Sequence, residues 1–171
     1  MQVFGIVGWK NAGKTELVVK LVEHFTANGL TVSTVKHAHH AFDVDVPGKD
    51  SFRHREAGAS EVIVASENRY ALMHDHRGAS EPELDVLLGK LDPVPLVLVE
   101  GFKRQGHPKL EVIRGDGPDA PIALTDDSVI AVATDKKRDG ITVPQFDIND
   151  VAAIAQFITE ATGLSQQQTS S

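Results

Sequence analysis

The sequence predicts a three-layer α/β fold with a mostly parallel central sheet and an additional β-hairpin. Residues 3–7 form an apolar run that leads into a glycine-rich loop and then into a helical pattern. A second strand is expected at residues 31–35, and a strand, a helix and a strand in this order imply a right-handed parallel crossover. Residues 95–99 are apolar without alternation, which is typical of a central parallel strand buried on both faces.

The first helix is expected to begin at the glycine-rich loop and to stop at Asn28-Gly29. Its apolar side chains recur at helical spacing, at Leu17, Val18, Leu21, Val22 and Phe25. Residues 31–35 are rich in β-branched side chains, which favours a strand.

The periodic pattern ends between Lys36 and Asp50, where we expect a loop. A short helix is predicted over residues 51–57, capped by Asp50 and stopped at Gly58. Residues 61–65 and 70–73 then predict two strands, and the turn of a hairpin is expected at residues 66–69.

After a loop at residues 78–82, Pro82 is expected in the first turn of a helix that carries Leu84, Leu87 and Leu88. Further strands are predicted at residues 109–113 and 129–133, followed by a last amphipathic helix with Val151, Ile154, Ala155 and Ile158. We expect residues 1–164 to form a single domain and the polar residues 165–171 to be a disordered tail.

The loop between the first strand and the first helix matches the phosphate-binding pattern G-x-x-x-x-G-K-[ST]. Its residues are Gly8, Trp9, Lys10, Asn11, Ala12, Gly13, Lys14 and Thr15. A backbone turn of this kind directs N–H groups inward, and the following helix adds the positive end of its dipole, so the loop can hold an anion. We expect Lys14 to reach the β- and γ-phosphates of a nucleotide and Thr15 to bind Mg²⁺, which gives a P-loop fold.

Glu100 ends the continuous apolar strand, where an α/β sheet places its ligand-binding residues. It is expected to act with Thr15 at the magnesium site, and Lys14 and Glu100 are the candidate catalytic residues. The alternative is a solvated carboxylate at a strand end. Asp135 ends a later strand and could accept two hydrogen bonds from guanine. The usual guanine-binding pattern is incomplete here, so an ordinary aspartate at the start of a loop is an equal alternative.

The segment from Lys36 to Asp50 contains three histidines and three aspartates. Its spacing is poor for zinc, because neither thiolates nor a helical histidine pair is present. We favour a switch-like loop in which Asp43 or Asp45 approaches Mg²⁺ while lysine and histidine side chains meet an anionic substrate. Lys103 and Arg104, beyond Glu100, are a possible further anion contact or simply solvated surface.

Composition narrows the classes of function. The formal net charge of −7 argues against general nucleic-acid binding. The chain has no cysteine, which excludes disulfides and thiolate metal sites and fits a cytoplasmic protein. Neither a signal peptide nor an apolar stretch of about 18 residues is evident, so no membrane association is expected.

Several segments together resemble the MobB family, the molybdopterin-guanine dinucleotide biosynthesis adapter proteins. They are the loop from Gly8 to Thr15, Lys36-His37-x-His39-His40, Asp43-x-Asp45-x-Pro47-Gly48-Lys49-Asp50-Ser51, Ala57-Gly58-Ala59 and Val99-Glu100-Gly101-Phe102-Lys103. The similarity covers roughly Val3 to Phe157. The phosphate loop is shared by many families, whereas the histidine-aspartate run combined with Val-Glu-Gly-Phe-Lys is much more specific.

The resemblance implies a homodimeric P-loop protein of the SIMIBI class that binds GTP with Mg²⁺ and hydrolyses it slowly at most. It also implies association with a guanylyltransferase, MobA, which joins GMP to molybdopterin. Molybdopterin itself is a further candidate partner. One position departs from related SIMIBI proteins, which have a lysine as the second loop residue, where this chain has Trp9. Lys10 lies one place later and is given no role toward a dimer partner.

Two other functions are compatible with the same loop. An independent small-molecule kinase would need a general base, an acceptor pocket and an arginine-rich lid, for which the helix at 51–57 offers only Arg53 and Arg55. A non-catalytic nucleotide sensor would use the nucleotide only to change the shape of the loop from Lys36 to Asp50.

Overall fold

The computed structural model describes residues 1–38, 44–117 and 120–164. These residues divide into two compact units: Met1–His37 together with the chain from Leu84 onward, and the residues between Ala38 and Glu83. In the described part of the chain, no helix is both long and apolar enough to span a bilayer. The predicted disorder of residues 165–171 lies outside the described residues.

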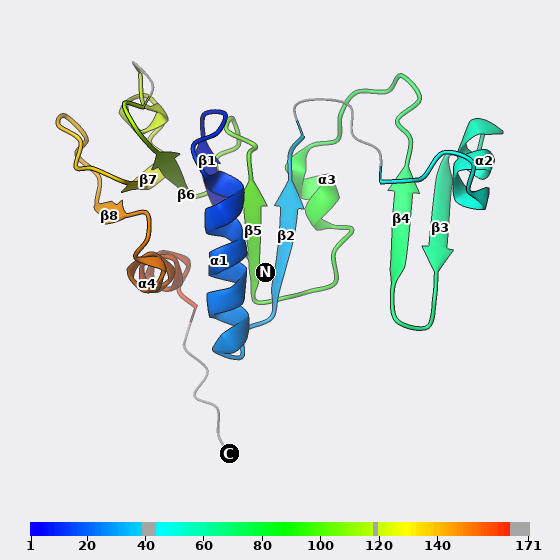
Figure 1. The fold of residues 1–171 in the computed structure, drawn as a ribbon, viewed down its shortest axis with the longest axis horizontal. Coiled ribbons are helices and arrows are strands. Elements are labelled where there is room, and N and C mark those ends of the chain that lie inside the picture. Colours follow the sequence, from blue (N-terminus) through cyan, green and yellow to red (C-terminus); the bar gives the residue numbers. More distant parts are fainter. Residues whose placement is uncertain (39–43, 118–119, 165–171) are drawn as a thin grey trace. The chain divides into compact units, whose positions relative to one another are not determined.

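The first unit is built on a six-stranded sheet in which every neighbouring pair is parallel (Figure 1). In spatial order the strands are β2 (Val32–Lys36), β5 (Leu96–Glu100), β1 (Gln2–Gly8), β6 (Lys109–Ile113), β7 (Val129–Thr134) and β8 (Gln145–Asp147). The predicted central strand is therefore correct, since β5 lies between β1 and β2 and all its residues are buried. The short strand β8 was not predicted, because three residues are too few to show a pattern.

Helices cover the sheet on both faces, which confirms the three-layer fold. Helices α1 (Lys14–Ala27) and α4 (Val151–Thr162) pack against each other and against the face that carries Phe4, Ile6 and Leu98 (Figure 1). On the opposite face, Val97 and Val99 pack against the short helix α3 (Leu84–Leu88). A 3-10 turn, η1 (Ile122–Leu124), follows β6.

The second unit contains helix α2 (Asp50–Glu56) and an antiparallel hairpin of β3 (Glu61–Ala65) and β4 (Tyr70–His74). The predicted hairpin is confirmed, and its turn is closed by a hydrogen bond from the Ser66 N–H to the Arg69 carbonyl. The predicted cap of α2 is wrong by one residue, because the extended residue before the helix is Lys49 and Asp50 is already helical.

Pro82 also lies outside the helix predicted for it, since α3 begins at Leu84. The helix has only five residues, and it is held by the burial of Leu84 against Val97 and Val99 rather than by its own hydrogen bonds.

Charged side chains are buried on the sheet face that α1 and α4 do not cover. Lys109 and Glu111 of β6 are fully buried. The Lys109 ammonium donates to the Ser128 hydroxyl and lies 3.3 Å from Asp126, while Glu111 accepts a 2.8 Å hydrogen bond from the Ala123 N–H. Burial raises the pKa of Glu111 above its ordinary value.

His107 packs at the start of β6 against Gly5 of β1. A Cβ atom at Gly5 would lie 2.6 Å from His107 Nε2, so only glycine leaves room for the ring. Burial, together with the nearby Lys109 ammonium, lowers the pKa of His107 from 6.5 to about 4 against the weaker opposing effect of Asp126. His107 is therefore neutral in the folded protein at neutral pH.

The low pKa of His107 predicts an acid-sensitive fold. Between about pH 6.5 and pH 4 the unfolded chain binds a proton that the folded chain does not, so the free energy of unfolding should fall as pH falls through this range. The loss should reach at most about 3 kcal/mol. It is measured by urea unfolding at a series of pH values, comparing the wild type with His107→Gln, which removes the titrating group.

His76→Gln is the matched control, because His76 is exposed. The control should keep the wild-type pH dependence, and a His107→Gln protein that also kept it would show that another group is responsible.

Candidate functional site

The loop between β1 and α1 has the backbone shape of an anion-binding loop. Gly8 and Gly13 have φ values of 145° and 98°, and Asn11 has a φ of 63°. At Gly8 a Cβ atom would lie 2.5 Å from the Val112 carbonyl oxygen of β6, so the chain can turn here only with glycine. Gly13 is the N-cap of α1, which places the positive end of a 14-residue helix at the loop.

Lys14 bends back across this loop, and its ammonium donates a 2.8 Å hydrogen bond to the Trp9 carbonyl. Burial lowers the pKa of Lys14; Glu100 opposes this effect, and the positive charges of Lys103 and Lys36 add to it. Lys14 thus lies close enough to one carboxylate and two other lysines to be affected by all three charges. This arrangement leaves an excess of positive charge, which an anionic ligand would neutralise.

Thr15 and Glu100 are in direct contact although they are 85 residues apart. The Thr15 hydroxyl donates a 2.8 Å hydrogen bond to Glu100 Oε1. Lys36, the last residue of β2, places its ammonium 3.1 Å from Thr15 Oγ1 and 3.2 Å from the same Glu100 oxygen. The strand register explains the cluster, because Glu100 is paired with Ile6 of β1 on one side and with Lys36 on the other.

A hydroxyl and a carboxylate oxygen this close together suit a hard divalent cation. Mg²⁺ takes oxygen ligands and is usually held by one or two protein groups plus phosphate oxygens and water. Thr15 and Glu100 therefore fit the magnesium role predicted for them. Residues 1–38, 44–117 and 120–164 contain no group of three or more histidine or acidic side chains that could hold a metal by themselves.

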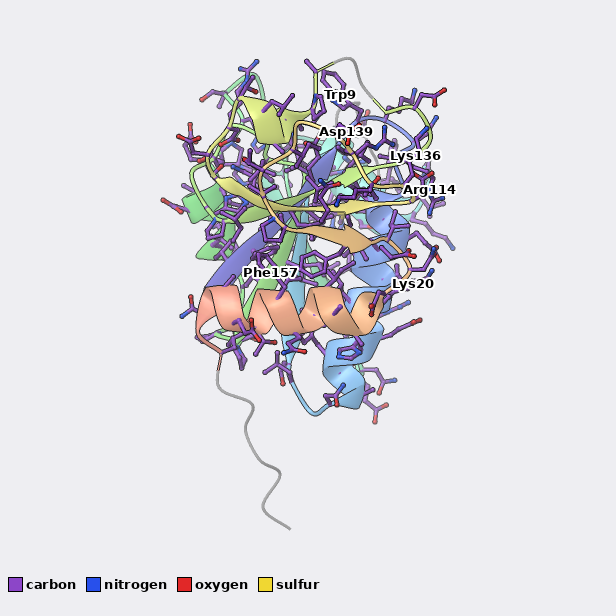
Figure 2. The ribbon with its side chains drawn as sticks, turned by 90° about the vertical axis from the view of Figure 1, so that its left-hand side faces the viewer. Trp9, Lys20, Arg114, Lys136, Asp139 and Phe157 are labelled. Carbon is purple, nitrogen blue, oxygen red and sulfur yellow. The ribbon has the colours of Figure 1, made fainter. Side chains whose placement is uncertain are left out.

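Trp9 lies at the outer side of the loop and is half exposed. The Lys103 ammonium is 4.4 Å from the centre of its ring, a cation–π contact that brings the loop after β5 to the phosphate loop. Beside them is a cavity of about 340 Å³. Its lining includes Lys10, Asn11 and Arg114, and Figure 2 shows Arg114 at the same end of the unit as Trp9.

Asp135 follows β7 and is tied to the loop after β6. Its carboxylate accepts a 2.8 Å hydrogen bond from the Gly115 N–H, which is the main reason that its pKa lies below the ordinary value. Arg138 approaches Asp135 to 3.6 Å and also donates to the carbonyls of Gly115 and Asp116. Two loops at neighbouring strand ends are thereby joined, and the guanine contact of Asp135 stays a prediction.

Asp45 belongs to the second unit. Its carboxylate is only 6% exposed, accepts a 2.8 Å hydrogen bond from Ser51 and lies 3.4 Å from Arg55 Nε. These contacts fix the shape of the chain before α2. The magnesium role of Asp45 is not tested by them, and His39, His40 and Asp43 of the predicted switch loop lie outside the described residues.

Sequence reasoning placed the whole loop from Gly8 to Thr15 together with Glu100, but it missed the exact position of Lys36 and the role of Arg138. Lys36 meets Glu100 because the strands that end in these two residues are neighbours in the sheet. The sequence shows where each strand ends but not which strands are neighbours, so this contact could not be predicted. Arg138 gave no signal in the sequence.

The chain was compared with known proteins. Residues 3–135 match the family model described as MobB, molybdopterin guanine dinucleotide synthesis protein B. Two relatives, from Escherichia coli and Haemophilus influenzae, are each named molybdopterin-guanine dinucleotide biosynthesis adapter protein. Both are 40% identical to this chain. The match to the first covers 92% of this chain and 91% of the relative, and the match to the second covers 91% of this chain and 86% of the relative.

Solved structures with the same fold carry related names. A crystal structure of molybdopterin-guanine biosynthesis protein B has a TM-score of 0.72 at 25% identity, with 92% of this chain and 98% of that chain covered. The crystal structure of Bacillus subtilis MobB has a TM-score of 0.76 at 22% identity, with 96% and 100% covered. These likenesses confirm the P-loop fold.

The close approach of Gly8 to Val112 predicts that the loop cannot accept a side chain there. Gly8→Ala adds a methyl group 2.5 Å from a backbone oxygen at a φ of 145°, so we expect the free energy of unfolding to fall by about 2 to 4 kcal/mol. Thermal and urea unfolding measure the change. Gly106→Ala is the control, since a Cβ atom there meets nothing within 4 Å, and equal losses in the two variants would contradict the predicted clash.

Proposed function

This chain belongs to the MobB family, and on that premise we propose that it is a GTP-binding adapter in the biosynthesis of molybdopterin guanine dinucleotide. In this proposal it assists the guanylyltransferase that attaches GMP to molybdopterin, and it hydrolyses GTP slowly at most. The adapter role is the one that the names of both 40% identical relatives give, and those relatives are matched over most of their length.

The observation that carries nucleotide binding is the contact of Thr15 with Glu100 beside Lys14. The loop from Gly8 to Thr15 directs a helix N-terminus at the place where phosphates would lie. Lys14 would exchange its hydrogen bond with the Trp9 carbonyl for the β- and γ-phosphates. Family and fold both support a nucleotide as the ligand.

Mg²⁺, when bound, would neutralise charge on the β- and γ-phosphate oxygens. Thr15 would offer its hydroxyl oxygen to the ion, and Glu100 would hold a water of its coordination shell or a direct ligand position. Among Lys14, Thr15, Lys36 and Glu100, which the structure describes, the carboxylate of Glu100 is the group that could act as a base, and it already accepts from Thr15 and pairs with Lys36. That arrangement is consistent with slow hydrolysis.

Guanine is the base that we assign to this site. Asp135 lies at the end of β7, and the hydrogen bond from Gly115 holds its carboxylate in place. Its two oxygens would accept from guanine N1–H and the exocyclic amine, whereas adenine offers no such pair of donors.

A homodimer is part of the proposal. The hairpin of β3 and β4 has only two strands, and it leaves large apolar side chains exposed, among them Ile63, Val64 and Tyr70. Two-stranded hairpins are marginal without further packing, so a second copy of the hairpin is a suitable partner. We propose a cytoplasmic location, where GTP and the transferase would be available.

Loss of the Lys14 charge should remove nucleotide binding. Isothermal titration of the wild type with GTP, GDP and ATP in Mg²⁺ should show tighter binding of GTP than of ATP, and Lys14→Ala should weaken GTP binding at least about 100-fold. Lys20→Ala is the control, because Lys20 is a partly exposed lysine on α1 that pairs with Glu16. Equal ATP binding would count against guanine, and retained affinity in Lys14→Ala would place the nucleotide elsewhere.

The same variants test the adapter role. Added to a guanylyltransferase with molybdopterin and GTP, the wild type and Lys20→Ala should raise the yield of molybdopterin guanine dinucleotide, and Lys14→Ala should not. An increase that is independent of Lys14 would separate the adapter role from nucleotide binding.

A charge on the hairpin should break the dimer. Ile63 is 64% exposed in the single chain and would be covered in the proposed dimer. Ile63→Glu would then bury an unpaired carboxylate at the interface, which is costly, so light scattering should report a monomer. Val19→Glu changes an exposed valine of α1 and should leave a dimer. A wild-type monomer, or a dimer in Ile63→Glu, would contradict the proposed interface.

A further inference from the structure

Lys36 occupies a place that the magnesium site also needs. Its ammonium lies 3.1 Å from Thr15 Oγ1 and 3.2 Å from Glu100 Oε1, and those are the two oxygens assigned to the ion. The Thr15 hydrogen is directed at Glu100, and Lys36 takes a lone pair of the same hydroxyl. The oxygen that would bind Mg²⁺ is therefore bound by a cation already.

The ammonium and the ion could not both keep these contacts. Mg²⁺ binds oxygen at about 2.1 Å, so an ion on Thr15 Oγ1 would stand within about 5 Å of an ammonium 3.1 Å from that oxygen. Two cations at this distance repel each other, and the one carboxylate that they would share, Glu100, carries only a single negative charge. Binding of the ion thus requires either that the Lys36 ammonium moves away or that a phosphate oxygen binds between the two cations.

The backbone of Lys36 is fixed while its side chain can move. Lys36 is paired with Glu100 in the sheet, and the next residue, His37, donates a 2.9 Å hydrogen bond to the Glu100 carbonyl. The side chain itself is 57% exposed, whereas that of Glu100 is 11% exposed. A flexible four-carbon stem on a fixed strand end can exchange one oxygen partner for another nearby.

We propose that Lys36 is a nucleotide-sensing residue, which stands in for the magnesium ion in the metal-free protein and turns to the terminal phosphate of a bound triphosphate when the ion arrives. This inference rests on the proposed nucleotide site and adds to it a residue that distinguishes GTP from GDP. In the metal-free state the lysine compensates the charge of Glu100 and keeps Thr15 and Glu100 together. In the triphosphate complex it makes a contact that a diphosphate cannot offer.

Mutation of Lys36 should have two separable effects. The first is on the metal-free, nucleotide-free protein. Lys36→Met removes the ammonium that pairs with Glu100. The melting temperature of this variant should therefore fall by about 2 to 4 °C, and it should recover when Mg²⁺ alone is added. The wild type and the control Lys20→Met, which also loses a partly exposed lysine paired to a glutamate, should respond less to Mg²⁺.

The second effect is on the choice between triphosphate and diphosphate. With Mg²⁺ present, titration should show that Lys36→Met lowers the ratio of GTP affinity to GDP affinity by about 5- to 10-fold, while the affinity for GDP changes less than about 2-fold. Lys36→Arg keeps the charge and should restore most of the ratio. This second variant also guards against a folding defect in Lys36→Met.

The outcomes distinguish this inference from the proposed function. If the wild type binds GTP and Lys36→Met keeps both the wild-type affinity ratio and the Mg²⁺ response of Lys20→Met, the sensing role is overturned and the nucleotide site stands. If the wild type binds no nucleotide, the nucleotide site is overturned, and the sensing role with it. Loss of GTP and GDP affinity to the same degree would make Lys36 a general phosphate contact and would also overturn the sensing role.

Discussion

The hydrogen bond between Thr15 and Glu100 is the constraint on which the site depends. It joins the first turn of α1 to the end of β5, and it can form only because β5 pairs with β1 in a register that places Glu100 opposite Ile6. The chain then turns at Gly8 toward the helix, with no room for a side chain against the Val112 carbonyl of β6. Sheet register and one glycine together determine where the Thr15 hydroxyl and the Glu100 carboxylate meet.

The lysines at the strand ends have a charge opposite in sign to the net charge of the protein. The chain carries a formal charge of −7, yet Lys14, Lys36 and Lys103 gather around Glu100. Such a local excess of positive charge focuses anions on one end of the sheet while the remaining surface repels them. Such a compact arrangement suits a small phosphorylated ligand.

The two units differ in how much of their apolar surface is buried within the chain. In the first, the central strands β5 and β6 are buried throughout, and the buried Lys109 has partners in Asp126 and Ser128. In the second, the hairpin exposes apolar side chains on a sheet of two strands. An exposed apolar hairpin is consistent with the proposal that the protein works by binding other chains.

The sequence by itself determined the local elements and the phosphate loop. Its signals were short-range: the glycine and lysine spacing from Gly8 to Thr15, the unbroken apolar run that ends in Glu100, and the turn between β3 and β4. Only the tertiary structure decided which strand ends meet. The place of Lys36 on Thr15, the clamp of Arg138 on the Gly115 loop and the burial of Lys109 all follow from strand order and register, and these depend on contacts between residues far apart in the chain.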